Sequence, residues 1–385
     1  MSSGTKTFIF AGLLLFATAL LLVAAIGELE QSGERLSSFS EGEYHGDNIV
    51  LDEEIGIPEE AEILSALSEV MDVVEDLGPI NSLLVSQRGE LLGERYFGSM
   101  RASRANNIKS ASKSILSLLT GIAIDKGYLE GVDQPIGPFF PEIFEQNPDP
   151  ERELITIEDL LTMRSGLAST SGRSYGAWVV SSNWMRWALN RPMTGTPGVD
   201  RNYSTGNTHL LSVIITRATG MSTLQFANRY LFGPLNIRVY GWDRDPQGYY
   251  FGGNNMALLP RDMVKIGQLM LDMGEHNGEQ IISPEWIIRS VDPVTGRRAN
   301  IDNYGYLWFR RVSADHHMVY AFGNGGQYIM VLPELDAVIA VTTWNETGQS
   351  TRQYRRKLFD VLDRDLVPLL VLRRNGSRDL ISASR

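Results

Sequence analysis

The chain has 385 residues, of which 43% are hydrophobic and 21% are charged, so it is an ordinary globular sequence with enough apolar material for a large core. Its net charge of −11 argues against binding to nucleic acid, which needs a basic surface. It contains no cysteine, which excludes disulfides, thiolate metal sites, a cysteine nucleophile and a bacterial lipid anchor through cysteine.

The N-terminus carries an uncharged, apolar segment from Phe8 to Ile26. A helix of this length spans about 28 Å, close to the thickness of the bilayer core. Lys6 precedes the segment and acidic residues follow it, so the positive-inside tendency places the rest of the chain outside the cytoplasm. We therefore predict a retained transmembrane anchor within residues 1–27, with the folded domain on the periplasmic face if the protein is bacterial. The alternative is a signal peptide cleaved after Val23-Ala24-Ala25, which would give a secreted protein.

The remaining chain divides into three predicted parts. Residues 28–58 are acidic with scattered Ser and Gly, a composition typical of an extracytoplasmic tether. We expect the globular domain over 59–372 and a polar tail over 373–385.

Within this domain, hydrophobic spacing predicts a helix and a hairpin first, helices in the middle and strands towards the end. Ala61–Leu77 is predicted as a helix, and Ile80–Ser86 and Leu91–Phe97 as the strands of the hairpin. The predicted middle helices begin near Ser110, after Thr156, at Trp178 (to Asn190) and at Asn207 (to Gly220). Strands are expected over Tyr306–Arg311, Met318–Phe322, Gln327–Leu332 and Val338–Thr343, before a helix over Arg352–Leu372. This order predicts an α/β (α+β) fold, with a central antiparallel sheet flanked by helices and an all-helical lobe.

The helix near Ser110 contains Ser-x-x-Lys, with Ser110 and Lys113 three residues apart. Residues at this spacing are neighbours on a helix, so the Lys113 amine can reach the Ser110 hydroxyl. A serine becomes a nucleophile when a nearby base takes its proton, and lysine can be that base if burial lowers its pKa. A second Ser-x-x-Lys, from Ser3 to Lys6, has nothing around it to bury its lysine.

Several other short sequence segments, in the right order along the chain, support a functional role for the Ser110 motif. Together they resemble the serine β-lactamase and penicillin-binding-protein superfamily, and most closely its class C-like branch with esterases and 6-aminohexanoate-dimer hydrolases. The resemblance covers roughly Ile63–Leu366 and implies a β-lactamase-like fold. The segments, with the motif itself, are Ser110-Ala111-Ser112-Lys113, Leu160 to Leu167, Pro197-Gly198, Tyr203-Ser204-Thr205, Gly206-Asn207-Thr208 and Gly323-Asn324-Gly325-Gly326-Gln327.

The resemblance implies a catalytic role for three residues. Ser110 would attack a carbonyl carbon, Lys113 would accept the proton, and Tyr203 would relay it to the leaving group and can share the base role. The backbone N–H groups of Ser110 and of a residue on the late strands would form the oxyanion hole, with Asn324 as our first choice and Gly325 next. The Gly-rich stretch can equally be a hairpin corner that needs positive φ.

Two further positions are candidates for substrate binding. Thr205 stands where family members often carry Asn or Ser, and its hydroxyl can accept a hydrogen bond from Lys113. Tyr175, with Trp178, would line an apolar acyl pocket above Ser110, although aromatic residues at such positions commonly serve packing alone.

The third motif differs from that of true β-lactamases and DD-peptidases. They carry Lys-Thr-Gly, whose cation meets a substrate carboxylate, whereas this chain has Gly323-Asn324-Gly325. We therefore predict a serine hydrolase of the carboxylesterase or amidase type that acts on small ester or amide substrates through an acyl-enzyme, without a cofactor or metal. The alternatives are β-lactamase or DD-peptidase-type activity, or a catalytically silent penicillin-binding-like sensor.

One rival motif lies within the chain. Gly172-Arg173-Ser174-Tyr175-Gly176 fits the Gly-x-Ser-x-Gly elbow of α/β-hydrolases, but that elbow needs a buried strand before the serine. The residues before Ser174 are small and polar, which disfavours it. The five histidines form no His-x-x-x-His pair. The sequence indicates neither the natural substrate, nor the deacylation base, nor the oligomeric state.

Overall fold

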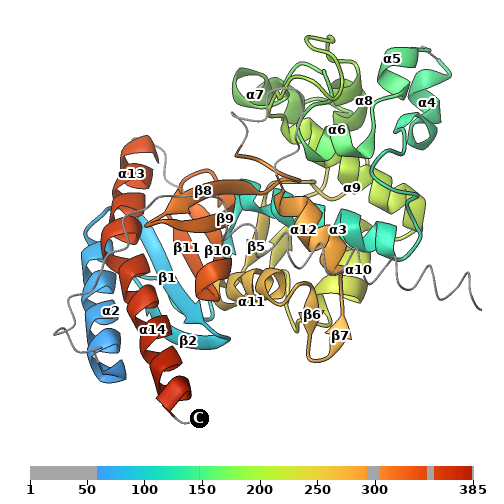
Figure 1. Cartoon of the computed structure of the whole chain (residues 1–385). Coiled ribbons are helices and arrows are strands. Elements are labelled where there is room, and N and C mark those ends of the chain that lie inside the picture. The colour runs from blue at the N-terminus through green and yellow to red at the C-terminus, as the bar shows by residue number, and fades with distance from the viewer. Residues whose placement is uncertain (1–58, 147, 293–302, 345–350, 384–385) are drawn as a thin grey trace, which may run out of the picture. The chain divides into compact units, whose positions relative to one another are not determined.

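The computed structural model describes residues 59–146, 148–292, 303–344 and 351–383 (Figure 1). The predicted anchor and tether over residues 1–58 lie outside these ranges, so both stay predictions. No helix within the described ranges is long and apolar enough to cross a membrane.

A six-stranded antiparallel sheet forms the centre of the folded unit. Its strands lie in the order β2, β1, β11, β10, β9 and β8, so the early hairpin joins the late strands through the pair β1–β11. Every residue of β1, β10 and β11 is buried, as expected for central strands rich in β-branched and aliphatic residues. The strands are β1 (Ile80–Gln87), β2 (Glu90–Tyr96), β8 (Phe309–Ser313), β9 (His316–Gly323), β10 (Gln327–Leu332) and β11 (Ala337–Thr343).

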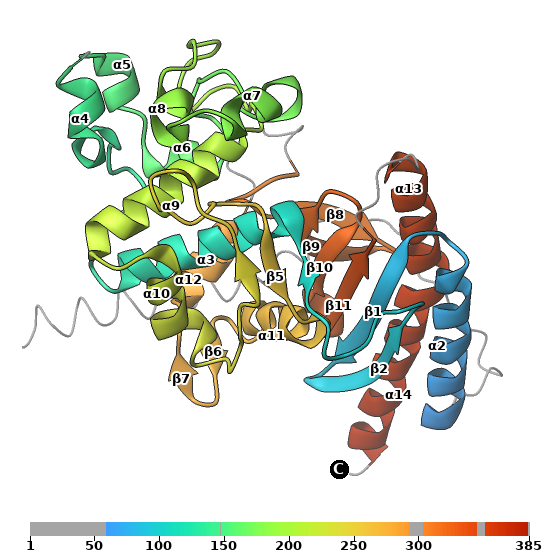
Figure 2. The ribbon, with the colours of Figure 1, turned by 180° about the vertical axis from the view of Figure 1, so that it is seen from behind.

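Helices cover both faces of this sheet (Figures 1 and 2). The helices α2 (Glu60–Glu75), α13 (Thr351–Val361) and α14 (Val367–Ala383) lie on one face, and α3 (Ser112–Asp125) and α11 (Pro260–Leu271) lie on the other. Neighbouring residues of β1 alternate between the two cores: Leu83 packs with the first group and Leu84 with the second.

The helical lobe packs against α3 through helix α9 (Thr205–Thr219). Figure 2 shows α9 lying along α3, with the shorter helices of the lobe beyond it. These helices are α4 (Pro141–Phe144), α5 (Pro150–Glu153), α6 (Ile157–Leu161), α7 (Tyr175–Val179) and α8 (Trp184–Leu189). Helix α10 (Thr223–Ala227) follows α9 and packs against it. The unit is completed by α12 (Pro284–Val291) and the short strands β3 (Asn106–Asn107), β4 (Gly241–Trp242), β5 (Met256–Leu258), β6 (Glu275–His276) and β7 (Glu279–Gln280).

The predicted α+β architecture is confirmed, with an antiparallel sheet, flanking helices and a helical lobe. The hairpin turn places Arg88 and Gly89 at positive φ, which suits a tight two-residue turn. The strand predicted over Gln327–Leu332 has those bounds in the structure, and Thr156 caps α6 through a reciprocal pair of hydrogen bonds with Asp159.

Two predicted helices differ from the observed ones. The continuous helix predicted over Trp178–Asn190 was wrong, because the Asn183 side chain caps a new helix there and divides the segment into α7 and α8. The closing helix continues beyond Leu372 to Ala383, and its buried Arg373 pairs with Glu60 of α2 and Glu90 of β2.

Gly121 marks a close approach between α3 and α12. A Cβ atom at Gly121 would lie 2.4 Å from the Trp286 ring, so we expect Gly121→Ala to lower the free energy of unfolding by about 1–3 kcal/mol. Gly176→Ala is the matched control, because Gly176 is exposed on α7 with open space around it. Denaturant unfolding curves measure both, and equal stabilities for the two variants would contradict this packing.

Candidate active site

Ser110 lies where the chain passes from the sheet into helix α3. A short 3₁₀ turn, Lys109–Ala111, leads into the helix, and Lys109 enters it with φ of 50°. The Asn107 side chain fixes this entry by accepting the Lys109 N–H at 2.9 Å. On the sheet side, a Cβ at Gly323 would lie 2.1 Å from the Ile108 carbonyl oxygen, so only glycine lets the end of β9 approach the serine so closely.

The Lys113 amine contacts the Ser110 hydroxyl, as the sequence spacing predicts. Its Nζ lies 3.1 Å from Ser110 Oγ and donates to the Gly253 carbonyl at 2.5 Å. The Lys113 side chain is 1% exposed, and its burial lowers the pKa from 10.5 to about 7. A neutral amine has one lone pair and two N–H bonds. With one N–H on the carbonyl, the lone pair is available to accept the serine proton.

Tyr203 lies on the other side of this pair, immediately before α9. Its ring centroid is 5.3 Å from Lys113 Nζ, and its backbone carbonyl accepts the Ser169 hydroxyl at 2.6 Å. Burial raises the pKa of Tyr203 to about 12, and a hydrogen bond with Ser110 opposes that rise. The phenol therefore keeps its proton at neutral pH and can donate it.

Thr205 forms its hydrogen bonds with the lobe. Its hydroxyl lies 3.0 Å from Ser171 Oγ, and its backbone N–H donates to the same oxygen at 2.9 Å. From the sequence we predicted that this hydroxyl accepts a hydrogen bond from Lys113. Within the described ranges, the side chain of Lys113 instead forms hydrogen bonds with Ser110 and with the Gly253 carbonyl.

Tyr175 is linked to the segment that contacts Lys113. Its hydroxyl accepts the Asn254 side-chain N–H at 2.8 Å, and Asn254 follows Gly253 directly. The ring stacks on Phe251, with centroids 6.5 Å apart. Tyr175 is half-buried beside the site. It packs against Phe251 and, through its hydrogen bond with Asn254, helps to position the loop that contacts Lys113.

Asn324 and Gly325 form the turn between β9 and β10. Asn324 is exposed, Gly325 has φ of 92°, and the Gly325 carbonyl accepts the Thr343 hydroxyl at 2.7 Å. The Gln327 side chain joins this turn to the Ser110 segment by accepting from Asn106 at 2.9 Å and donating to Thr343 at 2.7 Å. The hairpin-corner interpretation of this stretch is confirmed, whereas the oxyanion role of the two residues stays a prediction.

The Gly253 carbonyl is a part of the site that sequence reasoning missed. Gly253 has φ of 105°, and a Cβ there would lie 2.6 Å from Lys113 Cγ and 2.4 Å from Thr208 Oγ1. The run Gly252-Gly253-Asn254-Asn255 was a recognisable turn signal, but only the fold shows that this turn meets Lys113.

The structure gives no support to the rival nucleophile. Ser174 ends a 3₁₀ turn, Gly172–Ser174, that follows irregular chain, and its hydroxyl accepts from Arg191 at 3.3 Å. The strand that an α/β-hydrolase elbow requires is missing before it in the described chain. Within the described part of the chain, no three potential metal ligands lie close enough together to hold a metal ion.

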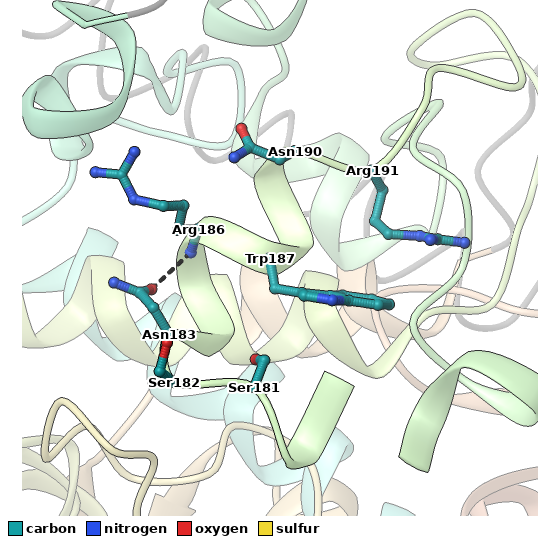
Figure 3. Close-up of a pocket in the computed structure, with 7 residues that line it drawn as sticks. All are labelled: Ser181, Ser182, Asn183, Arg186, Trp187, Asn190 and Arg191. Carbon is teal, nitrogen blue, oxygen red and sulfur yellow. Dashed lines mark hydrogen bonds between the residues drawn. The ribbon is translucent and has the colours of Figure 1, made fainter. Parts of the chain in front are cut away.

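An open pocket of about 360 Å³ lies on the lobe around α8 (Figure 3). Asn183 accepts the Arg186 backbone N–H at 2.8 Å on one side of it, and the Arg191 guanidinium lies over the Trp187 ring. Ser110, Lys113 and Tyr203 are not among its lining residues, so this pocket is separate from the serine cluster.

The amino-acid sequence is similar to those of known hydrolases. The chain is 25% identical over 289 residues to the 6-aminohexanoate-dimer hydrolase of Paenarthrobacter ureafaciens, covering 69% of this chain and 72% of the relative. It is 24% identical over 209 residues to the esterase EstB of Burkholderia gladioli, covering 48% and 53%.

The fold is shared with the octameric penicillin-binding protein homologue from Pyrococcus abyssi, with a TM-score of 0.57, 20% identity, and coverage of 77% of this chain and 76% of that one. A protein-family model described as Beta-lactamase matches residues 79–362. Because that match takes in well over half of the chain, the protein belongs to the Beta-lactamase family, whose relatives here are named as hydrolases.

Proposed function

We propose that this protein is a serine hydrolase that cleaves ester or amide bonds of small substrates through an acyl-enzyme on Ser110. The observation that carries the proposal is the buried Lys113 amine, which lies 3.1 Å from Ser110 Oγ and has a pKa of about 7. At neutral pH a large fraction of this lysine is uncharged, so it can act as a general base.

In the proposed acylation step, Ser110 Oγ attacks the substrate carbonyl carbon while its proton passes to Lys113 Nζ. When the tetrahedral intermediate collapses, the Tyr203 phenol gives its proton to the leaving oxygen or nitrogen and regains one from the Lys113 ammonium. A pKa of about 12 keeps this phenol protonated until that moment. In deacylation, water attacks the acyl carbon of the ester at Ser110 and gives a proton to Lys113 and Tyr203, which pass a proton to Ser110 Oγ as the acid product leaves.

The oxyanion formed in both steps needs two backbone donors. We propose the N–H groups of Ser110 and of Asn324, with Gly325 as the alternative to Asn324. The close approach of Gly323 to the Ile108 carbonyl and the Gln327–Asn106 hydrogen bond support this assignment, because they hold the turn against the serine segment.

The third motif and the relatives support the proposed substrate class. Gly323-Asn324-Gly325 offers no cation to a substrate carboxylate, which favours an uncharged acyl group. The relatives are named as a 6-aminohexanoate-dimer hydrolase and an esterase, consistent with ester or amide cleavage.

Substitution of the nucleophile tests the proposal. We expect Ser110→Ala to abolish labelling by a fluorophosphonate and to lower kcat for a short acyl ester by about 10³-fold or more, because the covalent route is lost. Ser174→Ala is the matched control and should leave both unchanged. Labelling that survives in Ser110→Ala and disappears in Ser174→Ala would contradict the assignment.

A substrate screen separates the alternatives. Short acyl esters, D-amino amides and a cephalosporin are compared with the wild-type protein, and esters or neutral amides are expected to give the highest kcat/KM. A cephalosporin as the best substrate would assign β-lactamase activity instead, and a single burst of acylation without turnover would indicate a sensor.

The pH dependence of acylation reports the lysine directly. Because only the neutral amine accepts a proton, kcat/KM should fall about tenfold per pH unit below a pKa of about 7 and reach a plateau above it. The Tyr203 pKa of about 12 predicts that the plateau continues beyond pH 9. An acidic limb centred near pH 4 would show that a carboxylate is the base.

Burial of Lys113 also predicts a pH-dependent stability difference from Lys113→Met. Between pH 7 and about pH 10.5 the unfolded lysine holds a proton that the folded lysine has released, so stability rises with pH. The wild-type free energy of unfolding should gain up to about 1.4 kcal/mol per pH unit over Lys113→Met in this window. Denaturant titrations at three pH values measure it, and parallel stabilities would contradict the lowered pKa.

A further inference from the structure

A buried histidine–aspartate pair lies behind the proposed catalytic groups. His209 on α9 and Asp245 in the loop between β4 and β5 have fully buried side chains, and His209 Nε2 is 2.9 Å from Asp245 Oδ2. Three aromatic rings, Trp178, Trp184 and Phe251, surround the imidazole with centroids 5.5–6.0 Å away. Polar groups enclosed in this way are costly unless they are fully hydrogen-bonded.

The hydrogen bonds of the pair select one tautomer of the histidine. Asp245 Oδ1 accepts the backbone N–H groups of Gln247 at 2.9 Å and Tyr249 at 2.8 Å, which leaves Oδ2 to face the imidazole. The Gly252 backbone N–H donates to His209 Nδ1 at 3.4 Å. Because Nδ1 accepts, the proton lies on Nε2 and is donated to Asp245.

The residue that contacts His209 is followed directly by the residue that contacts Lys113. Gly252 precedes Gly253, whose carbonyl accepts the Lys113 amine at 2.5 Å. A Cβ at Gly252 would lie 2.1 Å from the Thr208 carbonyl oxygen and 2.8 Å from His209 Cα, so this backbone is held directly against α9. The position of the Gly253 carbonyl therefore depends on the contact between Gly252 and His209.

We propose that His209 and Asp245 are positioning residues for Lys113: they fix Gly252 so that the Gly253 carbonyl takes one N–H of the neutral amine and directs its lone pair at Ser110. This inference rests on the proposed acyl-transfer function. Neither residue touches the substrate. A displacement of about 1 Å at a reacting group can cost about 10²-fold in rate, so the contact matters for catalysis although it lies outside the serine cluster.

Asp245→Asn tests the tautomer. The two backbone donors hold the amide oxygen in the place of Oδ1, so the amide NH₂ faces His209 Nε2 and the imidazole proton moves to Nδ1. The Nδ1–H of His209 then points at the Gly252 N–H, and because both groups are donors they repel each other. We expect kcat for a short acyl ester to fall about 10- to 100-fold while KM stays within about twofold, since the substrate-binding surface is unchanged.

The control is Asp262→Asn, which replaces a buried aspartate of α11 that pairs with Lys265. It should retain the wild-type kcat. Rates are expressed per serine titrated by fluorophosphonate, so a loss of folded protein alone does not lower them. An Asp245→Asn protein with the wild-type kcat per titrated site would overturn the inference.

A second pair of variants does not depend on Asp245→Asn folding. His209→Leu offers neither a donor to Asp245 nor an acceptor to Gly252, whereas the amide oxygen of His209→Asn can still accept the Gly252 N–H. We expect His209→Asn to acylate about tenfold faster than His209→Leu, and equal rates would overturn the inference. Failure of the wild type to label at Ser110 would instead refute the proposed function, so the two failures are distinguishable.

Discussion

The burial of one lysine amine is the constraint on which the rest of the site depends. An ammonium group is strongly disfavoured in a dry interior, so burial lowers the pKa of Lys113 from 10.5 to about 7. The amine can therefore act as a base near neutral pH. The enclosure needs three parts of the chain at once: the entry to α3, the loop before α9 and the Gly252–Gly253 segment. Each part is held in place either by a glycine that packs too closely against its neighbours to be replaced by a larger residue, or by buried hydrogen bonds.

The separate roles of Lys113 as base and Tyr203 as acid follow from the same burial. Burial disfavours the charged form of each group, so it lowers the lysine pKa and raises the tyrosine pKa. The phenol is therefore neutral at pH 7, and a large fraction of the lysine is neutral there as well. One has a free lone pair and the other has a proton to give, which are the requirements for accepting and returning the serine proton.

The sequence predicted the sheet, the hairpin and the Ser110–Lys113 contact, because each depends on periodicity or on local spacing. Long-range features were harder. The break between α7 and α8 depends on a single cap at Asn183, which a continuous apolar pattern conceals. The Gly253 carbonyl and the His209–Asp245 pair are separated from Lys113 by about a hundred residues or more, and a backbone acceptor leaves no side-chain signal. Nothing in the sequence marks Asp245 as the partner of His209, because only the fold brings the two residues together.

Helix α3 is enclosed along nearly its whole length, from Ser112 to Ala123. An interior element of this kind exchanges its amide hydrogens only when the surrounding structure opens cooperatively. The reactive serine precedes the buried N-terminal end of that element. Heat inactivation of this protein should therefore coincide with its main calorimetric transition rather than precede it through the loosening of a peripheral loop.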